Sequence, residues 1–239
     1  VDKDFLEQIK FKKKLYQNID FIICISNNTK KDLIDIYNID EKKISTIHLG
    51  VEQNNNFNQI KIKPKPFLLY VGRRDGYKNF NNLVKAYNNS EKIKSNFNIV
   101  CFGGGEFTKK EKKLFNELKL NHNILHYTGN DLDLNFFYKQ ARIFIYPSLY
   151  EGFGLPLLEA MNMSCAVACS NASCFPEICN DSAFYFDPND IESIKNQLEK
   201  TLFDDQLLSE MKIKGKNLIK NFSWQKCAYK TEEVYKSIL

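Results

Sequence analysis

From residue 67 onward, short apolar runs of strand length alternate with segments that have a helical spacing of apolar residues. Each run is mainly apolar without a regular polar alternation, which is the pattern of a strand buried on both faces. The runs cover residues 67–72, 98–102, 123–127, 142–146, 165–169 and 183–186. Helices are predicted between them near residues 79–89, 108–119, 131–140, 156–162 and 190–202. This order predicts an α/β fold with a doubly wound, Rossmann-like parallel sheet.

The two ends of the chain follow a different pattern. The first 65 residues predict a strand at 21–25, a helix from about 28 to 37 and a short strand at 43–47, too few elements for a domain. After Pro188 only helices are predicted, and the last, near 223–238, opens at Ser223, whose hydroxyl suits a helix N-cap.

Between these parts, residues 52–66 are polar and rich in Asn, and they end in two prolines. Such a composition is typical of an interdomain linker. We therefore divide the chain into four segments, which are residues 1–51, 52–66, 67–222 and 223–239.

Composition narrows the function only slightly. The 239 residues carry a formal charge of +5, and the Lys residues are spread among many Asp and Glu instead of forming a block, so we do not expect nucleic acid as a partner. The charge would suit a nucleoside diphosphate or weak attraction to an acidic membrane surface. No apolar run approaches the roughly 18 residues of a membrane span, and the first residues lack a signal peptide's apolar segment. We predict a cytoplasmic protein and leave peripheral membrane association open.

Four of the seven cysteines lie close together in the sequence, at Cys165, Cys169, Cys174 and Cys179. This spacing raises the alternative of a zinc site, but it contains no C-x-x-C pair. Two strand residues four apart also lie about 13 Å from each other at about 3.3 Å per residue. Reduced, buried thiols are the prediction.

Ligands of open parallel sheets bind beyond the carboxyl ends of the strands, so the loops there hold the candidate site. The loop after the first of these strands reads G-R-R-D-G-Y-K-N. Gly72 permits a tight turn, and Arg73, Arg74 and Lys78 place cations at the head of the next helix. This pattern predicts a clamp for a diphosphate. A solvated basic turn is an equal alternative on the pattern alone.

Two further loops carry weaker signals. G-G-G-E follows Phe102 but lacks the third glycine of G-x-G-x-x-G, so nicotinamide binding is not expected. T-G-N-D-L-D contains Asp131 and Asp133, a D-x-D pair that could hold a divalent metal. Because an apolar periodic helix starts there, we favour the alternative that these acids cap its first turn.

The strongest signal is E-G-F-G-L-P-L-L-E, from Glu151 to Glu159. The backbone amides of Phe153, Gly154 and Leu155 would lie at a helix N-terminus, which attracts anions. Carboxylates beside a phosphate instead accept hydrogen bonds from hydroxyls, Glu159 from a ribose diol and Glu151 from a transferred sugar. A glycosidase acid and nucleophile pair is the rival explanation, but it would not call for the arginines, the lysine or the glycine loop.

These motifs, in this order and spacing, resemble the retaining GT-B glycosyltransferases grouped as family 4, the glycosyl transferases group 1. The resemblance covers nearly the whole chain. The segments that carry it are F-I-I-C-I-S-N-N-T-K-K-D-L, K-I-S-T-I-H-L-G-V, Y-V-G-R-R-D-G-Y-K-N-F, Y-E-G-F-G-L-P-L-L-E-A-M and C-S-N-A-S-C-F-P-E-I with F-D-P-N-D.

The resemblance implies a nucleoside-diphosphate sugar as donor, with no cofactor and no metal, because protein cations do that work. It implies a catalytic set of Arg73, Arg74, Lys78 and Glu151. It implies a donor-binding set of Gly72, Gly103, Gly104, Gly129, Gly152, Phe153, Gly154, Leu155 and Glu159, in which Gly103, Gly104 and Gly129 lie by the base and ribose.

The resemblance also implies roles for the four segments. Residues 1–51 would be the tail of an N-terminal, acceptor-side domain, residues 67–222 the donor-binding domain, and residues 223–239 a helix that packs back toward the N-terminal part. The chain thus resembles the C-terminal half of a GT-B fold with a remnant of the other half. H-L-G-V stands where the family commonly has N-G-V, and we expect His48 to be structural.

The predicted function is that of a retaining hexosyltransferase, which moves a sugar to a saccharide, a lipid-linked or another hydroxyl acceptor in glycan or surface polysaccharide synthesis. The alternative is a nucleotide-sugar-binding module that is inactive without a missing N-terminal domain or a partner subunit. A GT-B sugar epimerase is a third alternative, which would need more acid and base groups than the sequence offers.

Overall fold

The computed structural model describes residues 3–53, 55–60 and 65–238, which form two compact units. The smaller unit combines the residues up to Gly50 with those from Phe222, and the larger unit runs from Val51 to Asn221. Residues 54 and 61–64 of the predicted linker lie outside the described residues.

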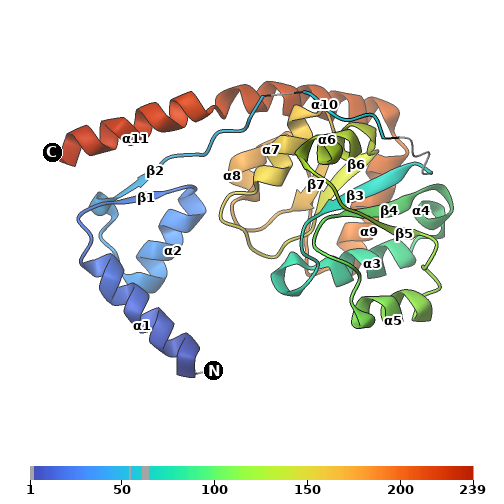
Figure 1. Cartoon of the computed structure of the whole chain (residues 1–239), viewed down its shortest axis with the longest axis horizontal. Coiled ribbons are helices and arrows are strands. Elements are labelled where there is room, and N and C mark those ends of the chain that lie inside the picture. The colour runs from blue at the N-terminus through green and yellow to red at the C-terminus, as the bar shows by residue number, and fades with distance from the viewer. Residues whose placement is uncertain (1–2, 54, 61–64, 239) are drawn as a thin grey trace. The chain divides into compact units, whose positions relative to one another are not determined.

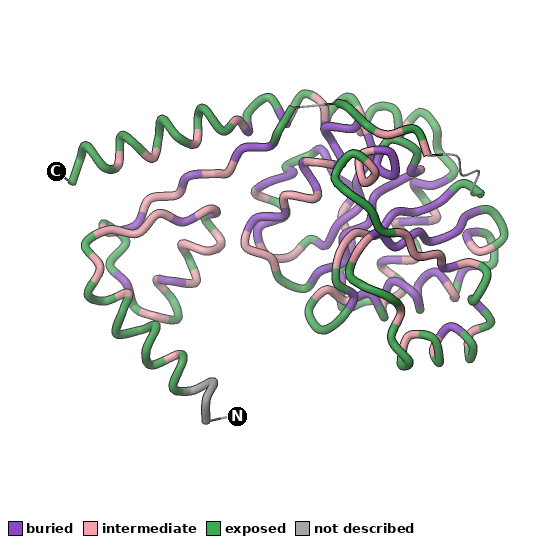
Figure 2. Tube along the Cα trace, viewed as in Figure 1, coloured by how far each residue is buried: buried purple, intermediate pink, exposed green. Residues whose placement is uncertain are grey.

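The larger unit is built on a six-stranded parallel sheet in the order β5-β4-β3-β6-β7-β8 (Figure 1). Its strands are β3 (Phe67–Val71), β4 (Asn98–Phe102), β5 (Ile124–Tyr127), β6 (Ile143–Tyr146), β7 (Val167–Ser170) and β8 (Phe184–Phe186). All neighbouring strands pair in parallel. Every predicted strand is confirmed to within two residues at either end. The central strands β4, β3, β6 and β7 are buried along nearly their whole length, whereas the edge strand β5 is only partly buried (Figure 2).

The helices of the larger unit follow the predicted alternation. They are α3 (Phe80–Asn88), α4 (Glu91–Asn96), α5 (Lys109–Glu117), α6 (Asp131–Gln140), α7 (Leu155–Asn162), α8 (Phe175–Cys179), α9 (Ile191–Leu202) and α10 (Asp205–Leu218). The chain moves outward from β3 to β5 on one side and from β6 to β8 on the other. Because parallel crossovers are right-handed, helices of these two halves cover opposite faces of the sheet, as the doubly wound prediction requires.

The smaller unit contains α1 (Lys3–Gln17), β1 (Ile22–Cys24), α2 (Asn27–Tyr37), β2 (Ile44–Thr46) and α11 (Trp224–Ile238). β1 and β2 pair in parallel, and a small core forms around Cys24, Leu33 and Ile44. The predicted N-cap of the last helix is confirmed, since the Ser223 hydroxyl accepts a hydrogen bond from the backbone N–H of Lys226 at 3.2 Å.

The described residues of the predicted linker lie along the larger unit. The backbone N–H of Asn58 donates to the carbonyl oxygen of Leu132 at 3.1 Å, and the Asn58 amide donates to the Asp133 carboxylate at 2.8 Å. The Asn162 amide donates to the carbonyl oxygen of Glu52 at 3.1 Å. Helices α6 and α7 thus hold this segment in place. None of the described helices is both long enough and apolar enough to cross a membrane.

Candidate functional site

The candidate site lies where the strand order reverses. β3 and β6 are neighbours, and the chain leaves them in opposite directions, so the loops at their carboxyl ends flank the switch point of the sheet. Two hydrogen bonds join these loops, from the Leu149 N–H to the Tyr77 carbonyl oxygen at 2.8 Å and from the Asn79 amide to the Pro147 carbonyl oxygen at 3.1 Å. The sequence motifs after β3 and β6 therefore meet in space.

Lys78 and Glu151 form an ion pair at this point. The Lys78 ammonium donates to Glu151 Oε1 at 2.6 Å and to the Tyr146 hydroxyl at 3.0 Å. Only 16% of the Lys78 side chain and 14% of the Glu151 side chain are exposed. Burial, and then the negative charge of Glu151, raise the pKa of Tyr146, so its hydroxyl stays protonated at neutral pH. The structure thus joins two residues that the sequence assigned to different parts of a donor.

Arg74 is buried within the protein and does not project from the loop as a free cation. Its side chain is 3% exposed, and its guanidinium donates to Glu111 at 2.7 Å and to three carbonyl oxygens of residues 103–106 at 2.7 to 3.1 Å. It also lies over the ring of Phe107, 4.9 Å from the centroid. The structure thus engages Arg74 within the protein, and its predicted role at a diphosphate stays a prediction. The guanidinium is already engaged and fixes the glycine loop to the loop after β3.

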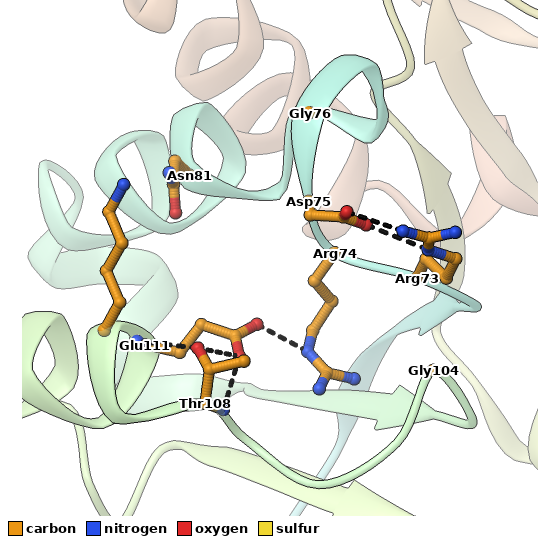
Figure 3. A pocket seen from close by; sticks show the side chains of 9 residues that line it. Arg73, Arg74, Asp75, Gly76, Asn81, Gly104, Thr108 and Glu111 are labelled. Carbon is orange, nitrogen blue, oxygen red and sulfur yellow. Dashed lines mark hydrogen bonds and ion pairs between the residues drawn. The ribbon is translucent and has the colours of Figure 1, made fainter.

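Arg73 is the exposed arginine of the pair. Its side chain is 76% exposed and pairs with the Asp75 carboxylate at 2.8 Å. Figure 3 shows the two arginines diverging from the loop, with Arg74 directed toward Glu111 and Arg73 toward Asp75. Arg73 therefore remains the arginine that could reach a diphosphate.

A pocket of about 340 Å³ lies between the loops after β3 and β4 (Figure 3). Its lining consists of Arg73, Arg74, Asp75, Gly76, Asn81, Gly104, Thr108, Lys110 and Glu111. The lining includes both signs of charge but none of Lys78, Glu151 and Glu159. The pocket therefore does not contain the ion pair of Lys78 and Glu151, which lies at the topological switch point of the sheet.

The glycine loop after β4 has an unusual backbone. Gly103, Gly104 and Gly105 all have a positive φ, between 71° and 77°. A Cβ atom on Gly104 would lie 2.1 Å from the carbonyl oxygen of Gly72, whereas Gly103 and Gly105 face open space. The two loops thus touch through backbone atoms at Gly72 and Gly104, an approach that only glycine permits.

The N-terminus of α7 begins at Gly154, whose φ is 92° and which provides no side-chain cap. The first-turn amides of α7 are therefore a place for an anion, although the proposed role of Gly152, Phe153, Gly154 and Leu155 stays a prediction. The backbone before this helix is fixed, since the Glu151 N–H donates to the Ser173 hydroxyl at 3.1 Å and that hydroxyl donates to the Glu151 carbonyl oxygen at 2.6 Å.

Glu159 lies on α7 and faces α6. Its carboxylate accepts a hydrogen bond from the Tyr138 hydroxyl at 3.2 Å. Burial raises the pKa of Glu159, the Tyr138 hydrogen bond opposes this shift, and the charge of Asp131 adds to it. Additional hydroxyl donors would stabilise a poorly solvated carboxylate of this kind. This property is expected of a residue that binds the ribose.

The D-x-D pair belongs to a helix cap. Asn130 and Asp133 form a reciprocal capping box at the start of α6, with both hydrogen bonds at 3.0 Å. This confirms the cap alternative. Gly129 is required beside it, because a Cβ atom there would lie 2.4 Å from the Asp133 carboxylate. Over residues 3–53, 55–60 and 65–238, no three His, Cys, Asp or Glu side chains gather as a metal-binding group, and the cysteines are free thiols.

Sequence reasoning missed four residues that touch the predicted site. These are Tyr146, Tyr138, Glu111 and His126, whose Nε2 lies 3.1 Å from the Gly103 carbonyl oxygen. The sequence does carry a signal for Glu111, since T-K-K-E places it three residues after Thr108, the spacing of a capping box. The other three meet the site only across neighbouring elements, which spacing along the chain does not reveal.

Comparison with known proteins gives a family-level match. Residues 52–218 match the sequence profile of the family described as "Glycosyl transferases group 1". O-antigen chain mannosyltransferase B of Escherichia coli is 28% identical over 94% of this chain and 63% of that protein. The N-acetylgalactosamine-N,N'-diacetylbacillosaminyl-diphospho-undecaprenol 4-alpha-N-acetylgalactosaminyltransferase of Campylobacter jejuni is 29% identical over 90% of this chain and 59% of that protein. The chain thus spans about three fifths of these relatives.

Solved structures agree on the fold. The glycosyltransferase from Rickettsia africae superposes with a TM-score of 0.81 at 25% identity, over 100% of this chain and 68% of that one. Anabaena HepE, solved in complex with UDP and glucose, superposes with a TM-score of 0.86 at 14% identity, over 97% and 67% of the two chains. At that identity the second likeness bears on the fold alone.

Proposed function

The chain belongs to the glycosyl transferases group 1 family, and from this we propose that it binds a nucleoside-diphosphate sugar and transfers the sugar with retention to a hydroxyl of a saccharide or lipid-linked acceptor. The observation that carries the proposal is the meeting of Lys78 and Glu151 at the switch point of the sheet, 2.6 Å apart. A cation for phosphate and an acceptor for hydroxyls, side by side, suit a sugar diphosphate.

Each part of the donor has a proposed partner. Lys78, Arg73 and the first-turn amides of α7 take the diphosphate, and Glu151 takes the transferred sugar. Glu159 takes the ribose diol, and its raised pKa supports a carboxylate that gains from hydroxyl donors. The glycine loop, which Arg74 holds in place, lies beside the base.

The proposed reaction follows from these assignments. As the bond between the anomeric carbon and the diphosphate breaks, negative charge grows on the leaving phosphate, where Lys78, Arg73 and the helix amides would stabilise it. The acceptor oxygen bonds to the anomeric carbon on the same face, and the departing phosphate oxygen takes the acceptor's proton. No metal or cofactor enters this scheme, because the protein supplies the positive charge.

Relatives suggest where to look for the substrate. One is named an O-antigen chain mannosyltransferase and another acts, by its name, on a diphospho-undecaprenol acceptor. We therefore place the reaction in glycan or surface polysaccharide synthesis, at a cytoplasmic membrane surface, with a mannosyl donor to be tested first.

The test is calorimetry on the 239-residue chain with UDP, GDP, ADP and the corresponding nucleotide sugars. Changing Lys78 to Ala should weaken nucleoside-diphosphate binding by about 1.5 to 3 kcal/mol, the usual worth of a hydrogen bond to a charged group. Lys85→Ala on the exposed face of α3 is the matched control. Unchanged affinity in Lys78→Ala would count against the diphosphate assignment.

Transfer is measured separately from binding. The anomeric configuration of the product, read by NMR, should match that of the donor, and an inverted product would overturn the proposal. If the chain binds a nucleoside diphosphate but transfers nothing to a saccharide or lipid-linked acceptor, the binding-module alternative is the one that stands.

A further inference from the structure

Three side chains share one hydrogen-bonding centre at the switch point. The Lys78 ammonium donates to Glu151 at 2.6 Å and to the Tyr146 hydroxyl at 3.0 Å, and it lies 5.1 Å from the Tyr146 ring centroid. In this state the charge of Lys78 is neutralised by Glu151. The two charged groups are therefore paired with each other before a nucleotide sugar binds.

A donor would change this balance. A diphosphate brings negative charge that competes with Glu151 for the ammonium, and once the phosphate takes Lys78, the carboxylate of Glu151 loses its cationic partner. A poorly solvated carboxylate that lacks its cation is costly. Sugar hydroxyls of the same ligand could supply the missing hydrogen bonds.

The surroundings limit the movement to the Glu151 side chain. Its backbone N–H and carbonyl oxygen are both bonded to the Ser173 hydroxyl, at 3.1 and 2.6 Å. The Cys174 thiol also lies 3.2 Å from the Glu151 carbonyl oxygen. The loop is thus fixed at this residue, and rotation of the carboxylate is the change that requires least rearrangement.

Tyr146 is fixed more firmly still. It ends β6, pairs with Cys169 of β7, and its ring lies 5.6 Å from the ring of Phe144 and 5.5 Å from that of Phe175. Only 2% of the residue is exposed. Its hydroxyl can therefore keep the ammonium in place when Glu151 turns away.

We infer that Lys78, Glu151 and Tyr146 exchange partners on donor binding: the diphosphate replaces Glu151 at the ammonium, the freed carboxylate accepts the sugar hydroxyls, and Tyr146 positions Lys78 throughout. The inference rests on the proposed function of the same site. Its consequence is that phosphate recognition and sugar recognition are coupled through one ion pair.

The coupling gives opposite effects for two substitutions. Glu151→Gln removes the anion that competes with phosphate, so a nucleoside diphosphate should bind about fivefold more tightly, while the extra affinity that the sugar provides is lost. Tyr146→Phe keeps the ring but removes one partner of the ammonium. It should weaken the diphosphate and the nucleotide sugar by the same factor, about fivefold, and leave their ratio unchanged.

The experiment is calorimetry with whichever of GDP and UDP binds the wild-type chain more tightly, and with its mannose or glucose derivative. Tyr87→Phe is the control, because it removes another buried hydroxyl that lies outside the site. The Tyr87 hydroxyl, on α3, donates to the carbonyl oxygen of Phe97 at the end of α4, at 2.7 Å. The decisive readout is the ratio of the Kd of the diphosphate to the Kd of the nucleotide sugar. Partner exchange changes this ratio in Glu151→Gln and leaves it unchanged in Tyr146→Phe, whereas a general loss of structure would affect both variants alike.

The outcomes separate the two proposals. If none of UDP, GDP, ADP and their sugar derivatives binds the wild-type chain, the proposed function fails. If any of them binds but Glu151→Gln weakens or does not change diphosphate affinity, partner exchange is overturned. Should Glu151→Gln not fold, Tyr146→Phe still decides, because an unchanged diphosphate Kd in that variant would also overturn the inference.

Discussion

The guanidinium of Arg74 lies 2.7 Å from the carboxylate of Glu111, with 3% and 12% of the two side chains exposed. This pair ties the loop after β3 to the first turn of α5, and the same guanidinium binds carbonyl oxygens of the glycine loop. A buried charge is tolerated only while its partners remain. Arg74 is therefore expected to determine the loop geometry beside the site.

Replacing Arg74 by Met should lower the free energy of unfolding by about 3 to 5 kcal/mol, because Glu111 would be left as a buried charge without its partner. Arg73→Met is the matched control on the neighbouring residue, whose side chain is 76% exposed. Its effect should stay within about 0.5 kcal/mol. Urea unfolding of both variants measures the difference, and equal losses would contradict the assignment of Arg74.

The stabilisation that Glu111 gives this network should be lost at acid pH. Burial alone would raise its pKa, but hydrogen bonds from Thr108 and Arg74 outweigh burial and lower the pKa below the ordinary 4.5. A lowered carboxyl pKa contributes stability above the unfolded value, and this contribution is lost as pH falls through the folded value. Glu111→Gln should therefore be less stable than wild type at pH 7, and the gap should narrow below about pH 4. Urea unfolding between pH 3 and pH 8 measures the gap, and a gap that does not change with pH would contradict the network.

The sequence predicts the sheet well because its signal is local. A run such as Phe67–Val71 is continuously apolar, and burial on both faces leaves few alternatives to a central parallel strand. The short helices α4 and α8 escape prediction, since six and five residues are too few to display a helical period. The topology rule also points to the loops after β3 and β6, which the structure brings together.

The roles of individual site residues are less accessible to sequence. Arg73 and Arg74 are adjacent in an irregular loop, and nothing local says which one is buried. That depends on where the glycine loop lies, about thirty residues later in the chain. Tyr146 likewise reads as an ordinary strand residue, and its contact with Lys78 exists only because β3 and β6 are neighbours.

The contact between the two glycine-bearing loops can be tested by a pair of alanine substitutions. A Cβ on Gly104 would lie 2.1 Å from the Gly72 carbonyl oxygen, whereas a Cβ on Gly103 meets nothing within 4 Å. Both have φ near +70°, so both variants share the cost of a left-handed alanine, about 1 kcal/mol. Gly104→Ala should lose several kcal/mol more, since the backbone must shift. Similar melting temperatures for the two variants would show that the loops do not touch.

The Glu159 carboxylate should lower the free energy of unfolding at pH 7 while strengthening nucleotide binding. Burial, and to a smaller extent the charge of Asp131, raise its pKa above the ordinary 4.5. A raised carboxyl pKa means that its contribution to stability is complete below the unfolded pKa and is lost as pH rises through the folded pKa. At pH 7 the native state therefore carries the cost of a poorly solvated carboxylate.

Glu159→Gln removes that charge and can still accept the hydrogen bond from Tyr138, so it should unfold at higher urea concentration than wild type at pH 7. At pH 4, where the carboxyl is largely protonated in both states, the gap should be small. The same substitution should weaken nucleoside-diphosphate binding by about 1 kcal/mol, because a neutral amide accepts ribose hydroxyls less strongly. Glu117→Gln, on the exposed side of α5, is the control and should change neither quantity. A variant that is less stable at pH 7 yet binds nucleotide normally would show that Glu159 serves the fold and not the ribose.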